Sequence, residues 1–507
     1  MLTPREHSQP IAISVFLSVA CLLLCGIASA APSINLSKKS GPPTSKILVS
    51  GRGFEPNVGV DIFFDTKDKA LVVTNGKGEF HDSRIYAPRS ARPGEHWVTA
   101  LERNNDKGAQ RSFLVQTDWS QFHFDSDGTR LNPYENVLNP RTAANLSVKW
   151  SYNTYDAVYS SPAVANGVVY IGSLNGYVYA LDARTGAKLW GYYTGRALAS
   201  SPAVGDGVVF IGSESGTMYA LKARTGKLLW SYDIAFDAFS EPTLADGIVY
   251  IGSGDPDYSV HALNARTGKQ LWSYRTGSYI TSSPAVANGV VYVGSWDNNV
   301  YALNAHTGSR LWSFATDSYV SSSPAIVDGV VYVGSADDNV YALNAQTGAK
   351  LWSYATDGYV FSSPAVANGV VYVGSFDGHL YVLNAHTGAL LWSYPLPNEE
   401  LSSPAVANGV VYVGSDQPED SMYALDADTG ALLWSYPSGW YVYSSPVVAN
   451  GVVYVGSYDG NVYAFGLPDG DGSKRDAASQ RPDPRTLRPD FSLKPSQPAA
   501  TRSGAEL

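Results

Sequence analysis

A unit of about forty residues recurs through the middle of the 507-residue chain and limits what this chain can fold into. Each copy reads Ser-Ser-Pro-Ala-Val, Asn-Gly-Val-Val-Tyr-Val-Gly, Val-Tyr-Ala-Leu and Thr-Gly-x-x-Leu-Trp-Ser-Tyr, with small variations. Its proline falls at Pro162, Pro202, Pro242, Pro284, Pro324, Pro364, Pro404 and Pro446. Steps of 40 or 42 residues are too regular for independent domains, so they indicate a repeat architecture.

Each copy predicts four short strands joined by tight turns. Asn-Gly and Asp-Gly favour hairpin turns because both central positions tolerate positive φ. Runs such as residues 290–293 (Val-Val-Tyr-Val) are apolar at successive positions, which indicates strands buried on both faces. Four-stranded sheets covered on both faces by their neighbours are the blades of a β-propeller.

The tryptophans of the fourth strand give the number of blades and the way the ring closes. One tryptophan follows each Thr-Gly, and each is predicted to fill the gap between adjacent blades. The last copy ends at Phe465 without a fourth strand, whereas Val148–Tyr152 precedes the first copy and has the same character. An eight-bladed propeller closed by this N-terminal strand is therefore predicted. The blade-docking residues are Trp150, Trp190, Trp230, Trp272, Trp312, Trp352, Trp392 and Trp434.

The repeat resembles that of the pyrroloquinoline quinone (PQQ) propeller family. The carrying motif is Asp-Gly-x-Val-Tyr-Ala-Leu-Asn-Ala-x-Thr-Gly-x-x-Leu-Trp, and Trp119–Phe122 with Thr129–Pro133 is similar to the lead-in found before such repeats. The resemblance covers residues 117–467 and implies the propeller fold. It implies two function classes, quinoprotein alcohol dehydrogenases and proteins that bind no quinone, including an outer-membrane assembly scaffold.

The cysteine content separates these two classes. The resemblance implies that a dehydrogenase would hold PQQ between an adjacent Cys-Cys disulfide and a Trp, with Ca²⁺ ligands beside it. Here the two cysteines, Cys21 and Cys25, both lie in a segment expected to be removed. We therefore expect no cofactor, no metal and no catalytic residue, and an exported non-catalytic binding or scaffold protein. The alternative is a PQQ-dependent oxidoreductase holding PQQ with Ca²⁺.

The N-terminus has the pattern of an export signal. Arg5 precedes an apolar stretch from Ile11 to Ile27, and Ala28-Ser29-Ala30 is the small-x-small pattern of a cleavage site. Residues 1–30 are expected to be a signal peptide, so that the protein is periplasmic, cell-surface or extracellular. An uncleaved anchor or lipidation of a cysteine are the alternatives.

Two further regions flank the propeller. Val58, Val60, Ile62 and Phe64 alternate as in a strand with one buried face. Residues 31–116 resemble the immunoglobulin-like modules of bacterial surface proteins in the motifs Gly41-Pro42-Pro43, Val49 to Pro56 and Pro93 to Val98. Residues 468–507 are rich in Pro, Ser, Asp and Arg, and predict a disordered tail.

Partners are constrained by charge. The net charge is −10, and the body of the chain has no Lys/Arg cluster, so nucleic acid is not expected to bind. No membrane span is expected after cleavage, which leaves an envelope or extracellular protein, or a carbohydrate. His261 and His379 are interpreted as residues of solvated turns.

Departures from the repeat supply the candidate binding residues. Glu241 stands where the other copies have serine, and aromatic residues recur on loops expected at one mouth of the channel. These aromatic residues are Tyr279, Tyr319, Tyr359, Tyr441 and Trp296. Enlarged hairpins in the third and seventh blades carry Asp255, Asp257, Asp416, Glu419 and Asp420, which would form an acidic rim for a cationic ligand or basic partner.

Overall fold

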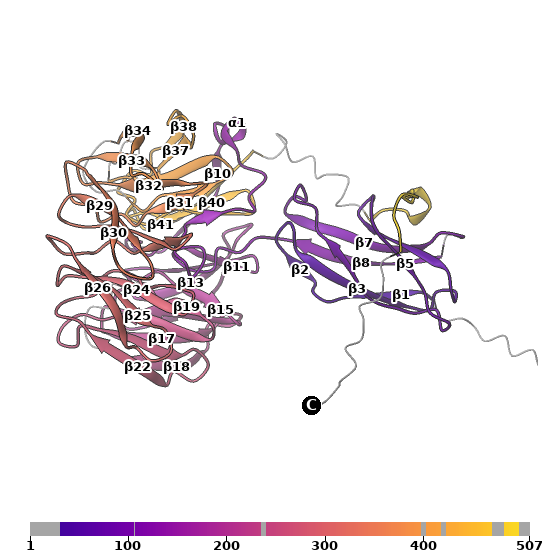
Figure 1. The fold of residues 1–507 in the computed structure, drawn as a ribbon, viewed down its shortest axis with the longest axis horizontal. Helices are drawn as coiled ribbons and strands as arrows, with labels where there is room; N and C mark the ends of the chain where they lie inside the picture. The colour runs from indigo at the N-terminus through magenta and orange to yellow at the C-terminus, as the bar shows by residue number, and fades with distance from the viewer. Residues whose placement is uncertain are drawn as a thin grey trace, which may run out of the picture.

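The computed structural model describes residues 31–105, 107–234, 240–396, 402–416, 422–468 and 481–495. Figure 1 shows a small β module, in indigo, beside a larger ring of sheets. The predicted signal peptide lies outside the described residues. No helix in the described ranges is both long and apolar enough to cross a membrane.

The module consists of two sheets that enclose one core. Its strands are β1 (Ser33–Leu36), β2 (Ser40–Gly41), β3 (Lys46–Arg52), β4 (Gly59–Phe64), β5 (Lys67–Val73), β6 (Phe80–Tyr86), β7 (Gly94–Glu102) and β8 (Gly108–Val115). The sheet orders are β1-β3-β6 and β2-β8-β7-β4-β5. Val60, Ile62 and Phe64 point into the core between them, as the alternation predicts.

The outer face of β4 is also buried, which the alternation did not predict. Phe63 is buried in a cluster with Leu101 and Leu487, a residue of the C-terminal segment. Residues 481–495, with a 3₁₀ turn at Pro484–Thr486, lie on the module, so the predicted disorder of 468–507 does not hold for this part. The prediction of disorder rested on the average composition of residues 468–507, and this average does not reflect the single apolar side chain of Leu487.

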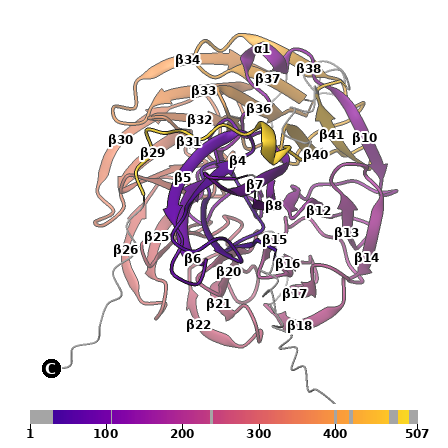
Figure 2. The same cartoon turned by 90° about the vertical axis from the view of Figure 1, so that its right-hand side faces the viewer.

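The remaining strands form eight antiparallel sheets within the described residues, which follow one another around a ring (Figure 2). The first four contain β11 (Ala163–Ala165), β12 (Val168–Gly172), β13 (Tyr177–Asp182), β14 (Lys188–Tyr193); β15 (Ala203–Gly205), β16 (Val208–Gly212), β17 (Thr217–Lys222), β18 (Leu228–Asp233); β19 (Thr243–Ala245), β20 (Ile248–Gly252), β21 (Ser259–Asn264), β22 (Gln270–Arg275); and β23 (Ala285–Ala287), β24 (Val290–Ser295), β25 (Asn299–Asn304), β26 (Arg310–Ala315).

The next three contain β27 (Ala325–Val327), β28 (Val330–Gly334), β29 (Asn339–Asn344), β30 (Lys350–Ala355); β31 (Ala365–Ala367), β32 (Val370–Gly374), β33 (His379–Asn384), β34 (Leu390–Pro395); and β35 (Ala405–Ala407), β36 (Val410–Gly414), β37 (Met422–Asp426), β38 (Leu432–Tyr436), with β9 (Leu131–Asn132) parallel to β35. The last contains β39 (Val447–Ala449), β40 (Val452–Gly456), β41 (Asn461–Gly466) and β10 (Ser147–Asn153). Helix α1 (Pro140–Ala143) precedes β10.

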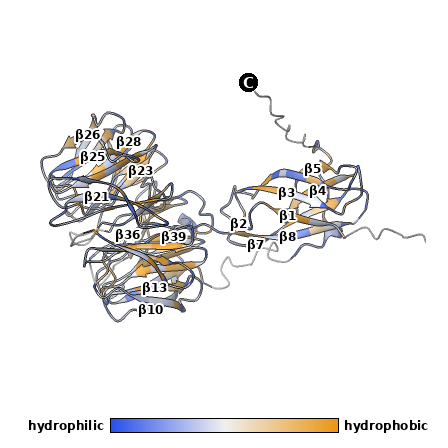
Figure 3. Cartoon of the chain, turned by 90° about the horizontal axis from the view of Figure 1, so that it is seen from below, coloured by the Kyte–Doolittle hydropathy of each residue, from blue (hydrophilic) through white to orange (hydrophobic). Residues whose placement is uncertain are grey.

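The last sheet confirms the predicted closure. Strand β10 pairs with β41, and Trp150 lies opposite Ala464. The second and third strands of the sheets, such as β36 and β13, are buried on both faces, and Figure 3 shows the apolar character of β36 and of the innermost strand β39. As predicted, tryptophans fill the gaps: Trp150 lies against Gly186 of the next sheet and donates from Nε1 to the Ala183 oxygen at 3.0 Å.

One lead-in segment, residues 117–132, bonds to the innermost strand of every blade in order. We call it the strap. It bonds in turn to Val164, Val204, Leu244, Val286, Ile326, Val366, Val406 and Val448. Backbone atoms make most of these bonds, while the side chains of Gln121 and Asn132 make those to Leu244 and Val448. The strap therefore ties the inner ends of the ring together.

Candidate functional site

A cavity of about 190 Å³ lies where the loops enter the innermost strands. Seven serines of the Ser-Ser-Pro motifs, with Glu241 in the eighth place, define what we call the inner ring: Ser161, Ser201, Glu241, Ser283, Ser323, Ser363, Ser403 and Ser445. Most of its members line the cavity. The turns at the other end of the first strands, such as Asn408-Gly409, share a space with Arg89 and Arg92 of the module. The cavity is thus at the mouth away from the module.

The inner ring is a circle of hydrogen bonds between blades. The backbone N–H of Ser161 donates to Ser201 Oγ at 2.8 Å, and the pattern repeats until the N–H of Ser445 donates to Ser161 Oγ at 2.9 Å. The intermediate bonds run from Glu241, Ser283, Ser323, Ser363 and Ser403 to the serine of the next blade. The motif serines therefore position one another around the axis.

Glu241 interrupts this circle with a carboxyl group. Ser283 Oγ donates to Oε2, and Ser201 Oγ donates to Oε1 at 3.5 Å. Burial raises the pKa of the Glu241 carboxyl to about 7, although the bond from Ser283 and the charge of Arg130 act in the opposite direction. The side chain is only partly exposed, and its exposed surface faces the cavity.

The strap lies at the inner end of the cavity, opposite the open mouth. Arg130 is fully buried, and its guanidinium donates to the backbone oxygens of Pro404, Phe122, Ser403 and Pro446 at 2.7–3.3 Å. The same guanidinium lies 4.7 Å from the centroid of the Phe122 ring, which lines the cavity. Because the strap bonds to the innermost strand of every blade on this side of the cavity, the open mouth is the side from which a ligand can reach the inner ring.

Aromatic side chains surround the open mouth in two arcs. One arc runs through rings 4.7–5.5 Å apart: Tyr279, Trp296, Tyr319, Phe361 and Phe376, with Tyr359 beside Phe361 at 5.6 Å. The other contains Trp440, Tyr441, Tyr443, Tyr458 and Tyr159, in which Tyr159 stacks on Tyr443 at 5.1 Å. Phe361, Phe376, Tyr159 and Tyr443 line the cavity itself.

The structure thus brings most of the predicted aromatic residues to one mouth. Tyr279, Tyr319, Tyr359, Tyr441 and Trp296 belong to the arcs, while the cavity walls use their neighbours. Site residues that the sequence prediction missed include Arg130, Phe122 and Phe361, and also Tyr159 and Tyr443, which line the cavity. Phe361 stands three residues before Pro364, where the fifth blade has Ser321, so comparing copies at this position would have found it.

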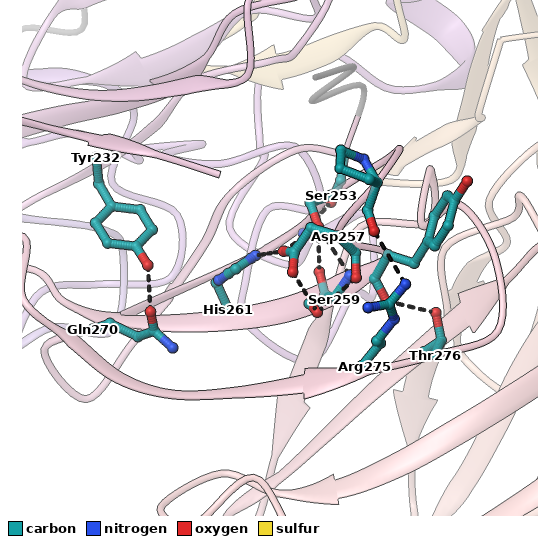
Figure 4. Close-up of polar contacts among 12 residues, drawn as sticks. Tyr232, Ser253, Asp257, Ser259, His261, Gln270, Arg275 and Thr276 are labelled. Atoms are coloured by element: carbon teal, nitrogen blue, oxygen red, sulfur yellow. Dashed lines mark hydrogen bonds and ion pairs between the residues drawn. The ribbon is translucent and has the colours of Figure 1, made fainter. Parts of the chain in front are cut away.

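The acidic hairpin of the third blade has a different role from the predicted one. Figure 4 shows the Asp257 carboxylate between Ser253, Ser259 and His261, and its Oδ2 lies 2.5 Å from His261 Nε2. The bond from His261 is the first cause of the lowered pKa of Asp257. His261 is buried, so its interpretation as part of a solvated turn is wrong. Asp257 holds the hairpin together and is not a free rim charge.

Of the other acidic residues predicted for the rim, Asp255 and Asp416 lie in the described part of the chain. Asp255 accepts a hydrogen bond from the Tyr258 hydroxyl, which again lies within the hairpin. Asp416 ends the described part of the seventh-blade hairpin, and Glu419 and Asp420 lie outside the described residues. Their role as an acidic rim stays a prediction.

Two family models match the chain. The model described as outer membrane protein assembly factor BamB matches residues 174–280, 256–403 and 397–482. The model described as the β-propeller domain of glucose/ethanol/alcohol dehydrogenase matches residues 119–198. Together they cover the strap and the repeats.

Among curated proteins, 1-butanol dehydrogenase (cytochrome c) of Thauera butanivorans is 34% identical over 80 residues, which is 15% of this chain. The match spans only 11% of that relative's length. Similarity of this extent concerns about two repeats, so the activity of that enzyme is not transferred by it.

Solved structures are similar over most of the ring. A europium-containing methanol dehydrogenase superimposes with a TM-score of 0.61 at 15% identity, covering 69% of this chain and 98% of that one. BamB from Moraxella catarrhalis superimposes with a TM-score of 0.56 at 20% identity, covering 63% and 99%. At these identities the likeness shows the propeller fold alone.

Proposed function

The chain belongs to the PQQ-like β-propeller repeat family, and from this premise we propose that it is an exported, non-catalytic binding or scaffold protein. The observation that carries the proposal is the blind cavity, which is closed by Arg130 and Phe122 and surrounded by aromatic residues at its open mouth. Exposed aromatic side chains around a polar cavity are typical of binding surfaces. Trp296 is 42% exposed and Trp440 is 52% exposed, so both are available to a partner.

The proposal also concerns the number of blades and the class of the N-terminal module. We propose that the ring has eight blades, a reading supported by the inner ring of hydrogen bonds that returns from Ser445 to Ser161. The module is proposed to be immunoglobulin-like, which its two facing sheets and single core support. Export rests on the N-terminal signal pattern, and the partner is an envelope or extracellular protein or a carbohydrate.

The second candidate, a PQQ-dependent oxidoreductase, fits the cavity poorly. PQQ carries three carboxylates that need cationic partners, but the guanidinium of Arg130 is already bonded to four backbone oxygens. Ca²⁺ takes six to eight oxygen ligands. Among the described residues that line the cavity Glu241 is the one carboxylate, and the described ranges hold no cluster of three or more His, Cys, Asp or Glu. We therefore propose that neither PQQ nor Ca²⁺ is bound.

The two candidates are separated by one pair of measurements. Purified protein with added PQQ and Ca²⁺ is expected to bind no PQQ in equilibrium dialysis and to reduce no artificial electron acceptor with alcohols. Immobilised protein is expected to retain envelope material in a manner that depends on Phe361 and Phe376. Quinone-dependent turnover, or retention unaffected by changing these rings, would contradict the proposed function.

A further inference from the structure

The cavity contains five hydroxyl groups whose protons have no acceptor among the described residues. Ser161, Ser323, Ser363, Ser403 and Ser445 each accept a bond from the preceding blade, but none donates one to another residue in the described part of the chain. All five line the cavity. Since a serine hydroxyl has one donor to give, these groups present convergent donors to whatever enters.

Glu241 offers the opposite capacity on the same ring. Its carboxyl group accepts from Ser283 and Ser201, and a carboxylate has about four acceptor positions, so further donors can be bound. The ligand must therefore both accept hydrogen bonds from serines and donate to a carboxyl group. An ammonium group cannot accept, and a carboxylate or sulfate group cannot donate, whereas sugar hydroxyls do both.

The two aromatic arcs supply apolar ring faces around the polar inner ring. Phe361 and Phe376 lie on one side of the mouth, and Tyr159 and Tyr443 lie on the other. The C–H face of a pyranose ring is apolar and packs on aromatic side chains, while its hydroxyl edge remains free for hydrogen bonds. The aromatic arcs thus match the apolar face of a sugar, and the inner ring matches its hydroxyl edge.

Size and depth specify how such a ligand would enter. At about 190 Å³ the cavity is smaller than the roughly 300–1,000 Å³ of pockets that hold drug-sized ligands, so it suits a single ring. The floor of Phe122 and Arg130 prevents a chain from passing through. A longer ligand must insert its end and lay the following units on the aromatic arcs.

From this geometry, and resting on the proposed function, we infer that the cavity binds the terminal residue of a neutral oligosaccharide end-on. Glu241 and the five serines contact its hydroxyl groups, and the rings of the rim hold the next one or two sugars. Specificity for the chain end follows because only a terminus can reach the inner ring.

The repeat provides variants that test this without altering the fold. Glu241→Ser installs the residue that the other seven blades carry. Phe361→Ser together with Phe376→Ala installs Ser321 and Ala336 of the fifth blade in the sixth. Leu311→Ala, an exposed residue on the outer strand β26, is the matched control. A cooperative melting transition at a temperature no lower than that of the wild type establishes that a variant remains folded.

The probe is an array of neutral, acidic and amino oligosaccharides, followed by calorimetric titration with the tetrasaccharides that bind. We expect binding of neutral oligosaccharides that share one terminal sugar, competition by that monosaccharide, and no binding when the terminal hydroxyls are methylated. Each cavity variant should weaken binding at least about tenfold, equivalent to 1.4 kcal/mol, and Leu311→Ala should not.

The inference fails if no neutral oligosaccharide binds at millimolar concentration, if binding prefers acidic glycans or a tetralysine peptide, or if methylated ends bind equally. If the inference fails but envelope material is still retained in a manner that depends on Phe361 and Phe376, the proposed binding function is not contradicted. If the protein neither binds an oligosaccharide nor retains envelope material, the proposed function is rejected as well.

Discussion

The indole of Trp312 packs on Gly348 of the next blade and donates from Nε1 to the Ala345 oxygen at 2.9 Å. A Cβ on Gly348 would lie 2.7 Å from the indole, and the backbone has φ +72°. Gly348→Ala should therefore destabilise the ring by about 3 kcal/mol or more, since it combines backbone strain with overpacking.

Gly329→Ala is the control for Gly348→Ala, because Gly329 has φ +77° with open space around its Cβ position. It should cost only the strain of about 1–2 kcal/mol. Chemical denaturation measures both variants. Equal losses would show that the contact with Trp312 contributes nothing.

Arg130 is expected to be the most sensitive residue of the strap. Arg130→Met keeps most of the side-chain volume but leaves four buried backbone oxygens of the strap and the last two blades without a donor. The expected loss is about 3 kcal/mol or more. Arg141→Met, at an exposed position in α1, should change stability by less than about 0.5 kcal/mol. A stable Arg130→Met protein would show that the strap does not hold the ring.

The C-terminal segment should detach when its apolar contact is lost. Leu487 is 4% exposed against Phe63 and Leu101, so Leu487→Asp would bury a charge and release residues 481–495. Tryptic cleavage after Arg485 should accelerate at least about tenfold relative to the wild type. Lys494→Asp, at an exposed position, serves as the control. Unchanged cleavage would show that contacts other than those of Leu487 hold residues 481–495 on the module.

Asp257 should contribute to stability in a pH-dependent manner. Its pKa is lowered first by the bond with His261, so the stabilisation is present above the ordinary carboxyl pKa and is lost as the pH falls through the lowered value. Asp257→Asn should therefore lower the melting temperature at pH 7, and its difference from the wild type should shrink as the pH falls below the ordinary value of 3.8. Asp255→Asn, whose carboxyl contacts the Tyr258 hydroxyl, should have a smaller effect at pH 7. A difference for Asp257→Asn that does not shrink on acidification would contradict the role of the pair.

Much of the fold follows from the period of the sequence. The four strands per copy and the pairing of β10 with β41 are consequences of turn residues and of a displaced Leu-Trp-Ser-Tyr-like strand, which local patterns record. The lead-in motif of the strap does not predict its bonds to the blades, because Trp119, Ser120 and Ser126 bond through backbone atoms that any residue possesses. Leu487 illustrates the same limit, since one apolar residue in a polar tail carries the contact.

The site was predictable only where it departs from the repeat. Glu241 is conspicuous because seven copies have serine there. Arg130 stands outside the repeat, so no comparison between copies marks it as buried. Asp257 and His261 are four residues apart on a hairpin and its following strand, and the sequence alone could not show that the side chains meet.

The raised pKa of Glu241 predicts a second pH effect, of opposite sign to that of Asp257. A carboxyl with pKa about 7 in the folded protein binds its proton more tightly than in the unfolded chain. The associated stability is fully present below the unfolded pKa of about 4.3 and is lost as the pH rises through 7. The melting temperature of Glu241→Gln should therefore gain on the wild type between pH 5 and pH 8. A constant difference between Glu241→Gln and the wild type would mean that the carboxyl does not titrate in this range and that the inner ring binds its ligand with an ionised Glu241.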